Sequence, residues 1–489
     1  MAISDAQFNQ WLVRENVQRC VLLEVQAHSG GGVVTRYMST HGFVSYPADT
    51  PANTAYDEIL LSVPRYNSVM SEQLRGYSKP AEGVVTIDNS SGVRDSWLLD
   101  AWDGRPFSLY LGDPSWPKSD FRLMVAGTIA DIVANDSRTL TLRTRDRQHL
   151  LEKPVNTTLV GGTDATKDAR VPVCYGECYN VEPVLTDSAT RTYAVHDGQI
   201  EAITAVYENG AAKAFTANLA TGTFTLTAAA QGRITADVKG SKTGGIYVNK
   251  TADIIQRILT ERTTLTVGDI DTASITALNT DVDGAVGLYV TDGDVLAALD
   301  KLVIGCGAFF TFDRAGKFYT AQLKAPAGPA TVTLLQDDVA QGAIAVAARW
   351  LPSKSVRLGY KRMWTKQSDG LSASVTDARR AELDQGYSIA KATNAIPQHI
   401  LADDPEVELS LFVASSDASA EATRRATLYG SIRFLLRATC FLGPARAKLG
   451  DVVQADLGGR FGMNGTAYAR IVGIDESPTS SRVELTLFV

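Results

Sequence analysis

The chain has 489 residues, of which 45% are hydrophobic and 21% charged, and its formal net charge is -7 at pH 7. This length allows three or four domains at about 150 residues each, and the hydrophobic fraction is that of packed globular cores rather than of a disordered chain. The mildly acidic charge disfavours a protein that reads DNA sequence, because such proteins present basic surfaces to the phosphates.

Neither a membrane span nor a disulfide framework is predicted. No stretch of about 18 consecutive apolar residues occurs, and residues 1–8 lack the basic and apolar regions of a signal peptide. The five cysteines, an odd number, are scattered along the chain and fit a reducing compartment. We therefore expect a protein that is made in a cytoplasm and has no stable membrane insertion.

Residues 1–155 are predicted to form a β domain after a short N-terminal helix. Short runs rich in β-branched and aromatic residues are separated by turn signals, and residues 139–145 alternate leucine with threonine and arginine. Short strands at this spacing predict a barrel or a sandwich. The predicted strands are 17–26, 33–38, 58–63, 83–87, 107–111, 121–133 and 139–145.

Residues 156–245 are predicted to be a small β domain. It begins after Lys153-Pro154 and contains the glycine-containing stretch 161–168, a linker or exposed loop; together they mark the first shift in composition. Asn209-Gly210 lies between the apolar runs 204–207 and 215–216 and is a strong signal for a two-residue hairpin turn.

Helical periodicity first appears after residue 246. Thr251 is expected to cap one helix, and Thr291 with Asp294 resembles a capping box ahead of a second helix that ends at Gly305. A hairpin is then expected, so we predict a small α+β domain over residues 246–325. The predicted hairpin strands are 308–312 and 317–322.

Residues 326–489 are predicted to return to β structure after the proline-rich linker 325–329, with one helix over 417–429. The last 42 residues read as three short alternating strands, of which the final one ends at Val489. A strand in this position must be paired or capped, which indicates a closed barrel or a neighbouring subunit. The predicted strands are 355–360, 406–412, 448–453, 465–474 and 483–489.

Cys174 and Cys178 are weak candidates for a metal site. Thiolates bind zinc and iron–sulfur clusters, but the usual two-residue gap is absent and the other cysteines are remote. Reduced thiols packed in a β turn are favoured. The run 281–284 resembles the start of a calcium loop without its later ligands, and 240–243 resembles a phosphate loop without its upstream glycine. No metal or cofactor is predicted.

No catalytic site is predicted either. The five histidines never occur as a near pair, and no Gly-x-Ser-x-Gly elbow marks a nucleophile. Asp337, Asp338 and the carboxylates of 403–406 could act as acid and base only if burial separated their pKa values. We expect them to be solvated loop residues. Acidic loops that faced a channel would repel phosphate.

Several segments together carry a resemblance to a known family. They are Lys153-Pro154, 171–176, 181–184, 193–198 and the closing pattern 449–451 with 471–474. In the order of these segments, most of the chain resembles a tail-tip or baseplate hub protein of a tailed bacteriophage.

The resemblance implies a mainly β, multidomain fold. Two tail-tube-like β barrels, 1–155 and 326–489, would flank the small β domain 156–245 and the small α+β domain 246–325. The family implies a homotrimer, in which three chains present six barrels to the hexameric tube above. Large apolar interfaces are expected in such a ring. The candidate interface residues are Phe309, Phe310, Leu435 and Leu436.

The implied role is structural, in the virion, and not enzymatic. The hub would close the tail tube, form a ring around the DNA channel, and anchor fibres or a central spike for attachment and genome ejection. Its partners would be the distal tail or tube protein, the tail fibres, the central spike and the tape-measure protein. DNA would pass through the channel without sequence-specific binding.

Two other interpretations stay open. The chain could be the hexameric distal tail protein, which has one tube-like barrel and a peripheral domain. In a different class, it could be a β-rich carbohydrate-binding or glycan-processing protein with tryptophans that stack on sugars, although aromatic residues in β proteins are more often core residues. The tryptophans in question are Trp97, Trp102, Trp116, Trp350 and Trp364.

Overall fold

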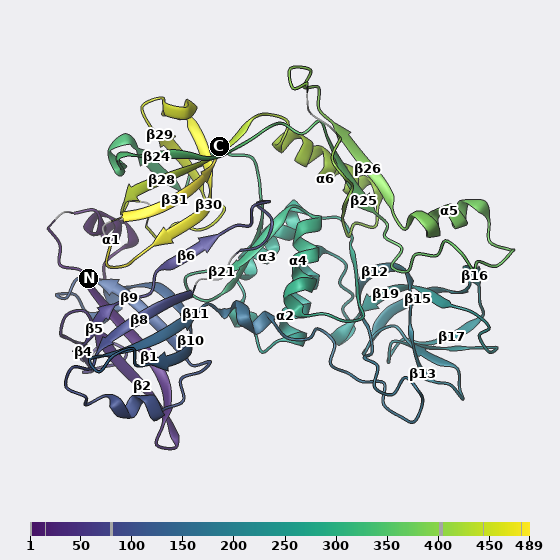
Figure 1. Ribbon diagram of the computed structural model, residues 1–489, viewed down its shortest axis with the longest axis horizontal. Coiled ribbons are helices and arrows are strands. Elements are labelled where there is room, and N and C mark those ends of the chain that lie inside the picture. The colour runs from purple at the N-terminus through teal and green to yellow at the C-terminus, as the bar shows by residue number, and fades with distance from the viewer. Residues whose placement is uncertain (1, 15, 79–81, 401–403, 444, 481) are drawn as a thin grey trace.

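The computed structural model describes the chain except for residues 1, 15, 79–81, 401–403, 444 and 481. The fold is mainly β and multidomain, as predicted, with its strands arranged in several sheets. In Figure 1 the N-terminal and C-terminal sheets lie one above the other, and a helical group connects them to further β structure on the right. The division at residues 155, 245 and 325 stays a prediction.

The N-terminal sheet is built from antiparallel strands with alternating burial. In β1 (Cys20–Ser29), for example, Val21, Leu23 and Val25 are fully buried in one cluster, as expected for side chains that alternate between the two faces of a strand. The other long strands are β2 (Gly32–Ser39), β8 (Glu82–Asp88), β9 (Pro106–Gly112), β10 (Arg122–Val133) and β11 (Thr139–Arg145), in the spatial order β2-β1-β9-β10-β11-β8.

One bent segment joins the two ends of this sheet. Its first half, β4 (Ala55–Glu58), pairs in parallel with β2, and its second half, β5 (Leu60–Ser62), pairs antiparallel with β8. Between them, Ile59 donates its N–H to the carbonyl of Ser39 at 3.1 Å and accepts the N–H of Asp88 at 2.9 Å. The segment therefore links the two ends of the sheet, although residues 32–37 of β2 keep one side unpaired within the described residues. β3 (Phe43–Val44) is a short addition beside β4.

The C-terminal sheet uses the same arrangement. β23 (Val332–Leu335) pairs in parallel with β29 (Val452–Asp456), and β24 (Val339–Trp350), which follows directly, pairs antiparallel with β28 (Arg433–Phe441). β30 (Ala467–Glu476) and β31 (Arg482–Phe488) complete the order β23-β29-β30-β31-β28-β24.

The final strand, β31, is an interior strand of this sheet. It pairs with β30 on one side and with β28 on the other. The expectation that a neighbouring subunit completes its edge is therefore wrong, because both rows of its backbone groups already have partners in the same chain.

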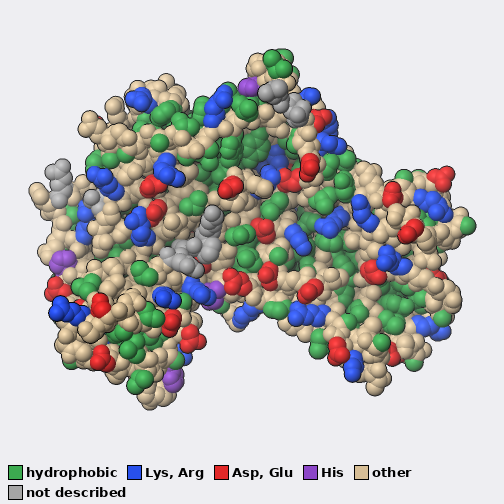
Figure 2. Space-filling view, in the orientation of Figure 1, with side chains coloured by type: hydrophobic (Ala, Val, Ile, Leu, Met, Phe, Trp, Pro, Cys, Tyr) green, Lys and Arg blue, Asp and Glu red, His purple; other side chains and the backbone are tan. Residues whose placement is uncertain are grey.

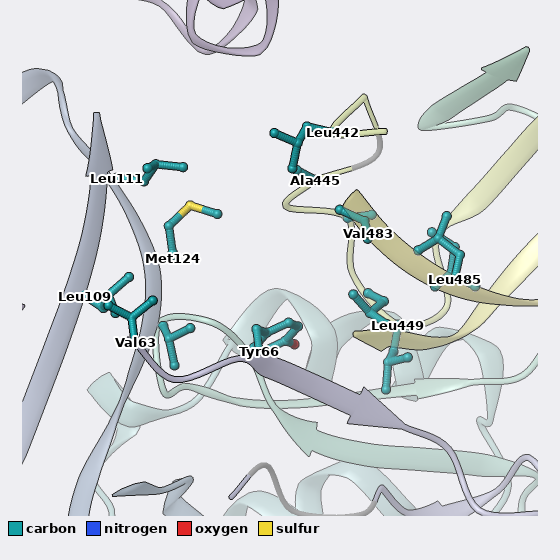
Figure 3. Packing of buried hydrophobic residues seen from close by; sticks show 14 of the residues in the cluster. Val63, Tyr66, Leu109, Leu111, Met124, Leu442, Ala445, Leu449, Val483 and Leu485 are labelled. Atoms are coloured by element: carbon teal, nitrogen blue, oxygen red, sulfur yellow. The ribbon is translucent and has the colours of Figure 1, made fainter. Parts of the chain in front are cut away.

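The two sheets share one hydrophobic core. β6 (Tyr66–Val69) leaves the N-terminal half and pairs with β30 of the C-terminal sheet. Figure 3 shows Val63, Leu109 and Met124 on one side of this core and Val483 and Leu485 on the other. Helix α1 (Asp5–Leu12), whose N-cap Ser4 forms a capping box with Gln7, adds Phe8, Trp11 and Leu12 to the same cluster. The two β units therefore cannot separate without exposing a common interior.

The helical group contains α2 (Thr251–Arg262), α3 (Thr272–Asp281) and α4 (Val295–Gly305), with the hairpin β21 (Ala308–Phe312) and β22 (Phe318–Gln322). The predicted end at Gly305 and the predicted hairpin are confirmed. The capping predictions are wrong in detail. Thr251 is the first helical residue after the N-cap Lys250, and Asp294 is itself the N-cap of α4, where it accepts the N–H of Ala297.

Phe309 and Phe310 are buried, so their prediction as interface residues is wrong. β21 lies between two cores, and its alternating side chains send Phe309 into the core shared by the two β units and Phe310 into the core of the helical group. β7 (Gly76–Tyr77) from the N-terminal half pairs with the other side of β21. Leu436 is also fully buried, and Leu435 is partly buried.

A second β group follows residue 170. Its larger sheet has the order β16-β15-β19-β12-β20, and its smaller sheet has the order β13-β14-β18-β17. Asn209 and Gly210, both at positive φ, form the predicted hairpin turn, but the returning strand is β16 and not residues 215–216, which belong to the smaller sheet. The bounds are β12 (Val173–Val181), β13 (Val184–Asp187), β14 (Thr192–Ala194), β15 (Ile200–Glu208), β16 (Ala211–Ala212), β17 (Phe215–Asn218), β18 (Thr223–Leu226), β19 (Ile234–Ser241) and β20 (Gly287–Val290).

Between β24 and β28 the chain leaves the C-terminal sheet and forms an arm. The arm contains a three-stranded sheet, β26-β25-β27, and two helices. The predicted helix at 417–429 is confirmed as α6 (Ser415–Leu428), whereas the predicted strand 406–412 is reduced to β27 (Glu408–Leu409). The remaining elements are β25 (Ser355–Tyr360), α5 (Asp377–Gln385) and β26 (Ser388–Thr393).

Candidate assembly surface

The candidate metal ligands do not form a metal site within the described part of the chain. Among the described residues, no group of three or more His, Cys, Asp or Glu side chains could hold a metal ion. Cys174 and Cys178 both lie on β12, fully buried in the hydrophobic core of the second β group. Burial and the neighbouring Cys174 raise the pKa of the Cys178 thiol well above its usual value. These thiols behave as small buried hydrophobes.

Carboxylates of the acidic runs form ion pairs with lysines or accept hydrogen bonds from backbone N–H groups, and those that the structure describes do not converge on a shared ion. Asp283 pairs with Lys250, and Asp281 accepts from Lys324 at 2.6 Å. Asp338 accepts the N–H of Leu335 at 2.8 Å. In the run 403–406, Asp403 lies outside the described residues, and Asp404 is an exposed carboxylate held by Lys391, which lowers its pKa to about 2.

A buried cluster at His196 connects the second β group to helix α2. Arg262 donates two hydrogen bonds to the carboxylate of Asp197, at 2.6 and 2.7 Å, and one to the hydroxyl of Tyr175 at 2.9 Å. The ring Nδ1 of His196 accepts the N–H of Cys174 at 3.1 Å. Burial lowers the pKa of His196 to about 4. The neutral ring therefore acts as a hydrogen-bond acceptor inside the protein.

The five tryptophans do not form a sugar-binding platform. Trp97 and Trp102 belong to the core shared by the two β units, and Trp116 and Trp350 pack against it. Trp364 packs between the helical core and the core of the second β group.

A buried ion network joins the arm to the rest of the molecule, and no feature of the sequence beyond an i,i+4 pair indicated it. Arg425 on α6 is 3% exposed and donates to Glu421 at 2.6 Å and to Glu408 at 2.7 Å. It also donates to the carbonyls of Ile304 and Gly305 at the end of α4. Arg75 donates to the other oxygen of Glu408. The network connects three parts of the chain that are far apart in sequence, at residue 75, at residues 304–305 and at residues 408–425.

Strand β24 is the main surface feature that the sequence reasoning missed. It pairs with β28 along one side, and along its other side the described part of the chain supplies no ladder partner. Ala345, Val346 and Ala347 are exposed, and residues 339–348 carry no charge. A long, uncharged, unpaired strand edge is a template for pairing with another chain. The run of alanines and valines was the available signal.

A groove of about 470 Å³ lies next to β24. Its walls include Ile344 and Phe441 on the sheet and Leu457 and Phe461 on the opposite loop. Phe461 holds a positive φ of 54°, and Gly458, Gly459 and Gly462 around it also have positive φ. A phenylalanine in the left-handed region is strained by about 1–3 kcal/mol, and such strain often occurs at functional sites. The groove and the unpaired edge together define the candidate assembly surface.

Hydrophobic side chains are also exposed beyond the end of β24. Figure 2 shows them gathered in a hollow of the upper surface, between the C-terminal sheet and α6. Leu351, directly after β24, is 60% exposed, and Trp350 and Leu435 are partly buried. Of the four predicted interface residues, only Leu435 retains exposed surface of this kind.

The comparisons with known proteins gave solved structures only. No family model and no curated protein matches the chain. Three of the solved structures to which it is similar are tail proteins. One is a tail protein from Neisseria meningitidis MC58, which is 10% identical with a TM-score of 0.40 over 96% of both chains.

Two further similar structures come from prophages. The 43 kDa tail protein of prophage MuSo2 from Shewanella oneidensis is 12% identical with a TM-score of 0.37, over 96% of this chain and 98% of that chain. The prophage tail protein gp18 from Listeria monocytogenes EGD-e is 8% identical with a TM-score of 0.42, over 95% and 94%. Because these sequence identities and TM-scores are low, the role of this chain rests on its own residues. In the described residues, no helix is long and apolar enough to span a membrane.

Proposed function

We propose that this chain is a structural, non-enzymatic subunit of a phage tail tip, the hub of the baseplate. Three copies would form a ring that closes the tail tube around the DNA channel. In this proposal residues 1–155 and 326–489 supply the two tube-like barrels of each copy, and residues 156–245 and 246–325 form the small domains between them.

One observation carries the proposal. Each chain holds two β units in which one bent segment links the two ends of the sheet, residues 55–62 in the first and 332–350 in the second. The two units share a core and are further linked by β6, so they form a fixed pair. Three such pairs would present six related β units, which suits a threefold ring beneath a sixfold tube.

A hub at the tail tip would have partners on both sides of its ring. The ring would contact the distal tail or tube protein above and would anchor tail fibres or a central spike, with the tape-measure protein in the channel before genome ejection. The chain is acidic overall, with a net charge of -7, so DNA would pass without sequence-specific binding. The protein would be made in the host cytoplasm and would reside in the virion.

The number of subunits tests the proposal. Native mass spectrometry and cryo-electron microscopy of the assembled ring should give three copies of the 52.4 kDa chain. Six copies in one ring would contradict the hub and favour the hexameric distal tail protein. Antibodies against the chain should label the tip of intact particles, and labelling along the tube or on the capsid would contradict the position.

The carbohydrate-binding interpretation has less support, because the tryptophans that would stack on sugars pack in or against the cores. A glycan array probed with the assembled protein should show no strong binding. A screen for peptidoglycan hydrolysis should likewise give no activity.

A further inference from the structure

We propose that the free edge of β24 pairs with the free edge of β2 in a second copy of this chain. This inference deepens the proposed function, on which it rests, by naming the two strands that form the contact between subunits.

The first edge belongs to β24. Its pairing with β28 is shifted at two places, between Val339 and Ile344 and between Val346 and Ala348, and such bulges bend a strand and interrupt its ladder. The backbone groups on its outer side have no ladder partner in the described part of the chain. An extended strand satisfies such a row of N–H and C=O groups best. The groove beside it can take the apolar side chains that such a strand would carry.

The second edge belongs to β2. Its whole length pairs with β1, but on the other side only Met38 and Ser39 pair with β4. The stretch 32–37 therefore has one unpaired side within the described residues. Val33 in this stretch is 53% exposed. The only charged residue of the stretch, Arg36, already pairs with Asp100 at 2.9 Å. The edge is therefore electrically neutral, like the uncharged stretch of β24.

The charges that flank the two edges are complementary. Arg349 near the end of β24 and Arg460 across the groove have no carboxylate within salt-bridge distance among the described residues, and both are exposed. At the β2 edge, Glu58 of β4 is exposed and has no cationic partner among them. Asp57 beside it has only a 3.8 Å contact with Arg94. Cations at one edge and carboxylates at the other favour a contact between unlike edges.

The two edges of one chain lie too far apart to pair with each other, so the contact must form between two copies. Figure 1 shows β24 at the upper end of the paired β units and β2 at the lower end, with the N-terminal sheet between them. A contact between unlike surfaces at opposite ends is heterologous, so each copy can bind one neighbour through β24 and another through β2. Such contacts generate a ring when the rotation closes.

The molecule already contains the same kind of contact in one chain. β6 from the N-terminal half adds to the C-terminal sheet beside β30, in register from Tyr66 to Val69. The proposed contact extends this pattern to a second edge of the same sheet, with the added strand supplied by a neighbouring copy.

Charged substitutions on each edge test the contact. Val346→Lys on β24 and Val33→Lys on β2 should each weaken self-association at least about tenfold, because a lysine on a strand edge opposes pairing. Val93→Lys is the matched control, since Val93 is an exposed valine, 69% accessible, in a turn outside both edges. Sedimentation velocity over a range of protein concentrations measures the association of each variant.

Mixing the two blocked variants gives a sharper result. The Val346→Lys chain keeps an intact β2 edge and the Val33→Lys chain keeps an intact β24 edge, so an equal mixture should form a dimer and stop there. If two β24 edges paired with each other, Val33→Lys would assemble like the wild type, and this result would overturn the proposal.

A chemical cross-link supplies an independent readout. The double variant Val346→Cys and Val33→Cys should be joined between copies by a short bis-maleimide, with little background because the five native cysteines are buried. A wild-type chain that stays monomeric, together with no cross-link, refutes the contact. If the wild type forms an oligomer and Val346→Lys does not change it, the contact between β24 and β2 is refuted, but the proposed trimeric hub is not. A ring of six that both lysines disrupt would keep the contact and refute the trimer.

Discussion

Replacing Arg425 by methionine removes the centre of the buried ion network. The side chain is 3% exposed, and its loss leaves Glu421, which is 5% exposed, with Arg424 as its remaining cationic partner. The carbonyls of Ile304 and Gly305 also lose their donor at the end of α4. Breaking a buried ion pair from one side typically costs about 3–5 kcal/mol when the remaining charge has no other partner. Because Glu421 keeps Arg424 and Glu408 keeps Arg75, we expect a loss near the lower end of this range in the stability of α6.

The measurement is hydrogen exchange of the α6 amides, which reports the free energy of opening this segment even in a multidomain chain. The matched control is Arg65→Met, because Arg65 pairs with Asp475 at 2.7 Å but its side chain is 58% exposed. Exposed pairs contribute about 0–1 kcal/mol. A loss below about 1 kcal/mol for Arg425→Met, the range of an exposed pair, would contradict a stabilising role of the buried network.

A double variant separates the charge from the packing. Arg425→Met combined with Glu421→Gln removes both charges of the pair and keeps most of their volume. Arg424, which also loses its pair with Glu421, is 26% exposed and can be solvated, so part of the lost stability should return. If the double variant is as unstable as the single one, the network stabilises α6 through its hydrogen bonds to α4 and not through the neutralised charge.

Three further predictions concern stability and reactivity. Because burial lowers the pKa of His196 to about 4, the unfolded chain binds more protons than the folded one below about pH 6.5. The stability that comes from keeping His196 neutral is complete above pH 6.5 and falls by up to about 3 kcal/mol as the pH is lowered toward 4. His196→Gln should therefore make Tm less dependent on pH between 4 and 6.5. An unchanged dependence would contradict a neutral, buried His196. Gly287→Ala should cost about 3 kcal/mol in urea unfolding, because its Cβ would lie 1.8 Å from the carbonyl oxygen of Glu177, whereas Gly32→Ala, with nothing within 4 Å, should be nearly neutral. Ellman's reagent should react with the five buried cysteines only after unfolding, and a fast reaction in the folded state would show an accessible thiol.

The local elements were predictable because their signals lie within a few residues. The alternation of 139–145 matches β11 (Thr139–Arg145), and the apolar run 308–312 matches β21 (Ala308–Phe312). Asn209-Gly210 identified a hairpin because only a few residue types adopt positive φ at both central positions of such a turn. β24 was missed because its alanines and glycine have weak strand propensity and no alternation.

The candidate assembly surface could not be predicted from the sequence. Whether the edge of β24 is free depends on which strands reach it, and those strands come from residues more than 80 positions away. The burial of Phe309 could not be predicted either. An apolar run has the same sequence pattern whether its side chains face solvent, a partner chain or two cores at once.

The mainly β character, most strand positions and the helices α2, α4 and α6 could be predicted from local sequence, since periodicity and turn residues act over a few neighbouring residues. The strand partners depend on the whole fold: β6 pairs with β30, β7 pairs with β21, and the segments 55–62 and 332–350 link the ends of the two sheets. Backbone hydrogen bonds are the same for every residue type, so the choice of a distant partner depends on how the whole chain buries its apolar faces.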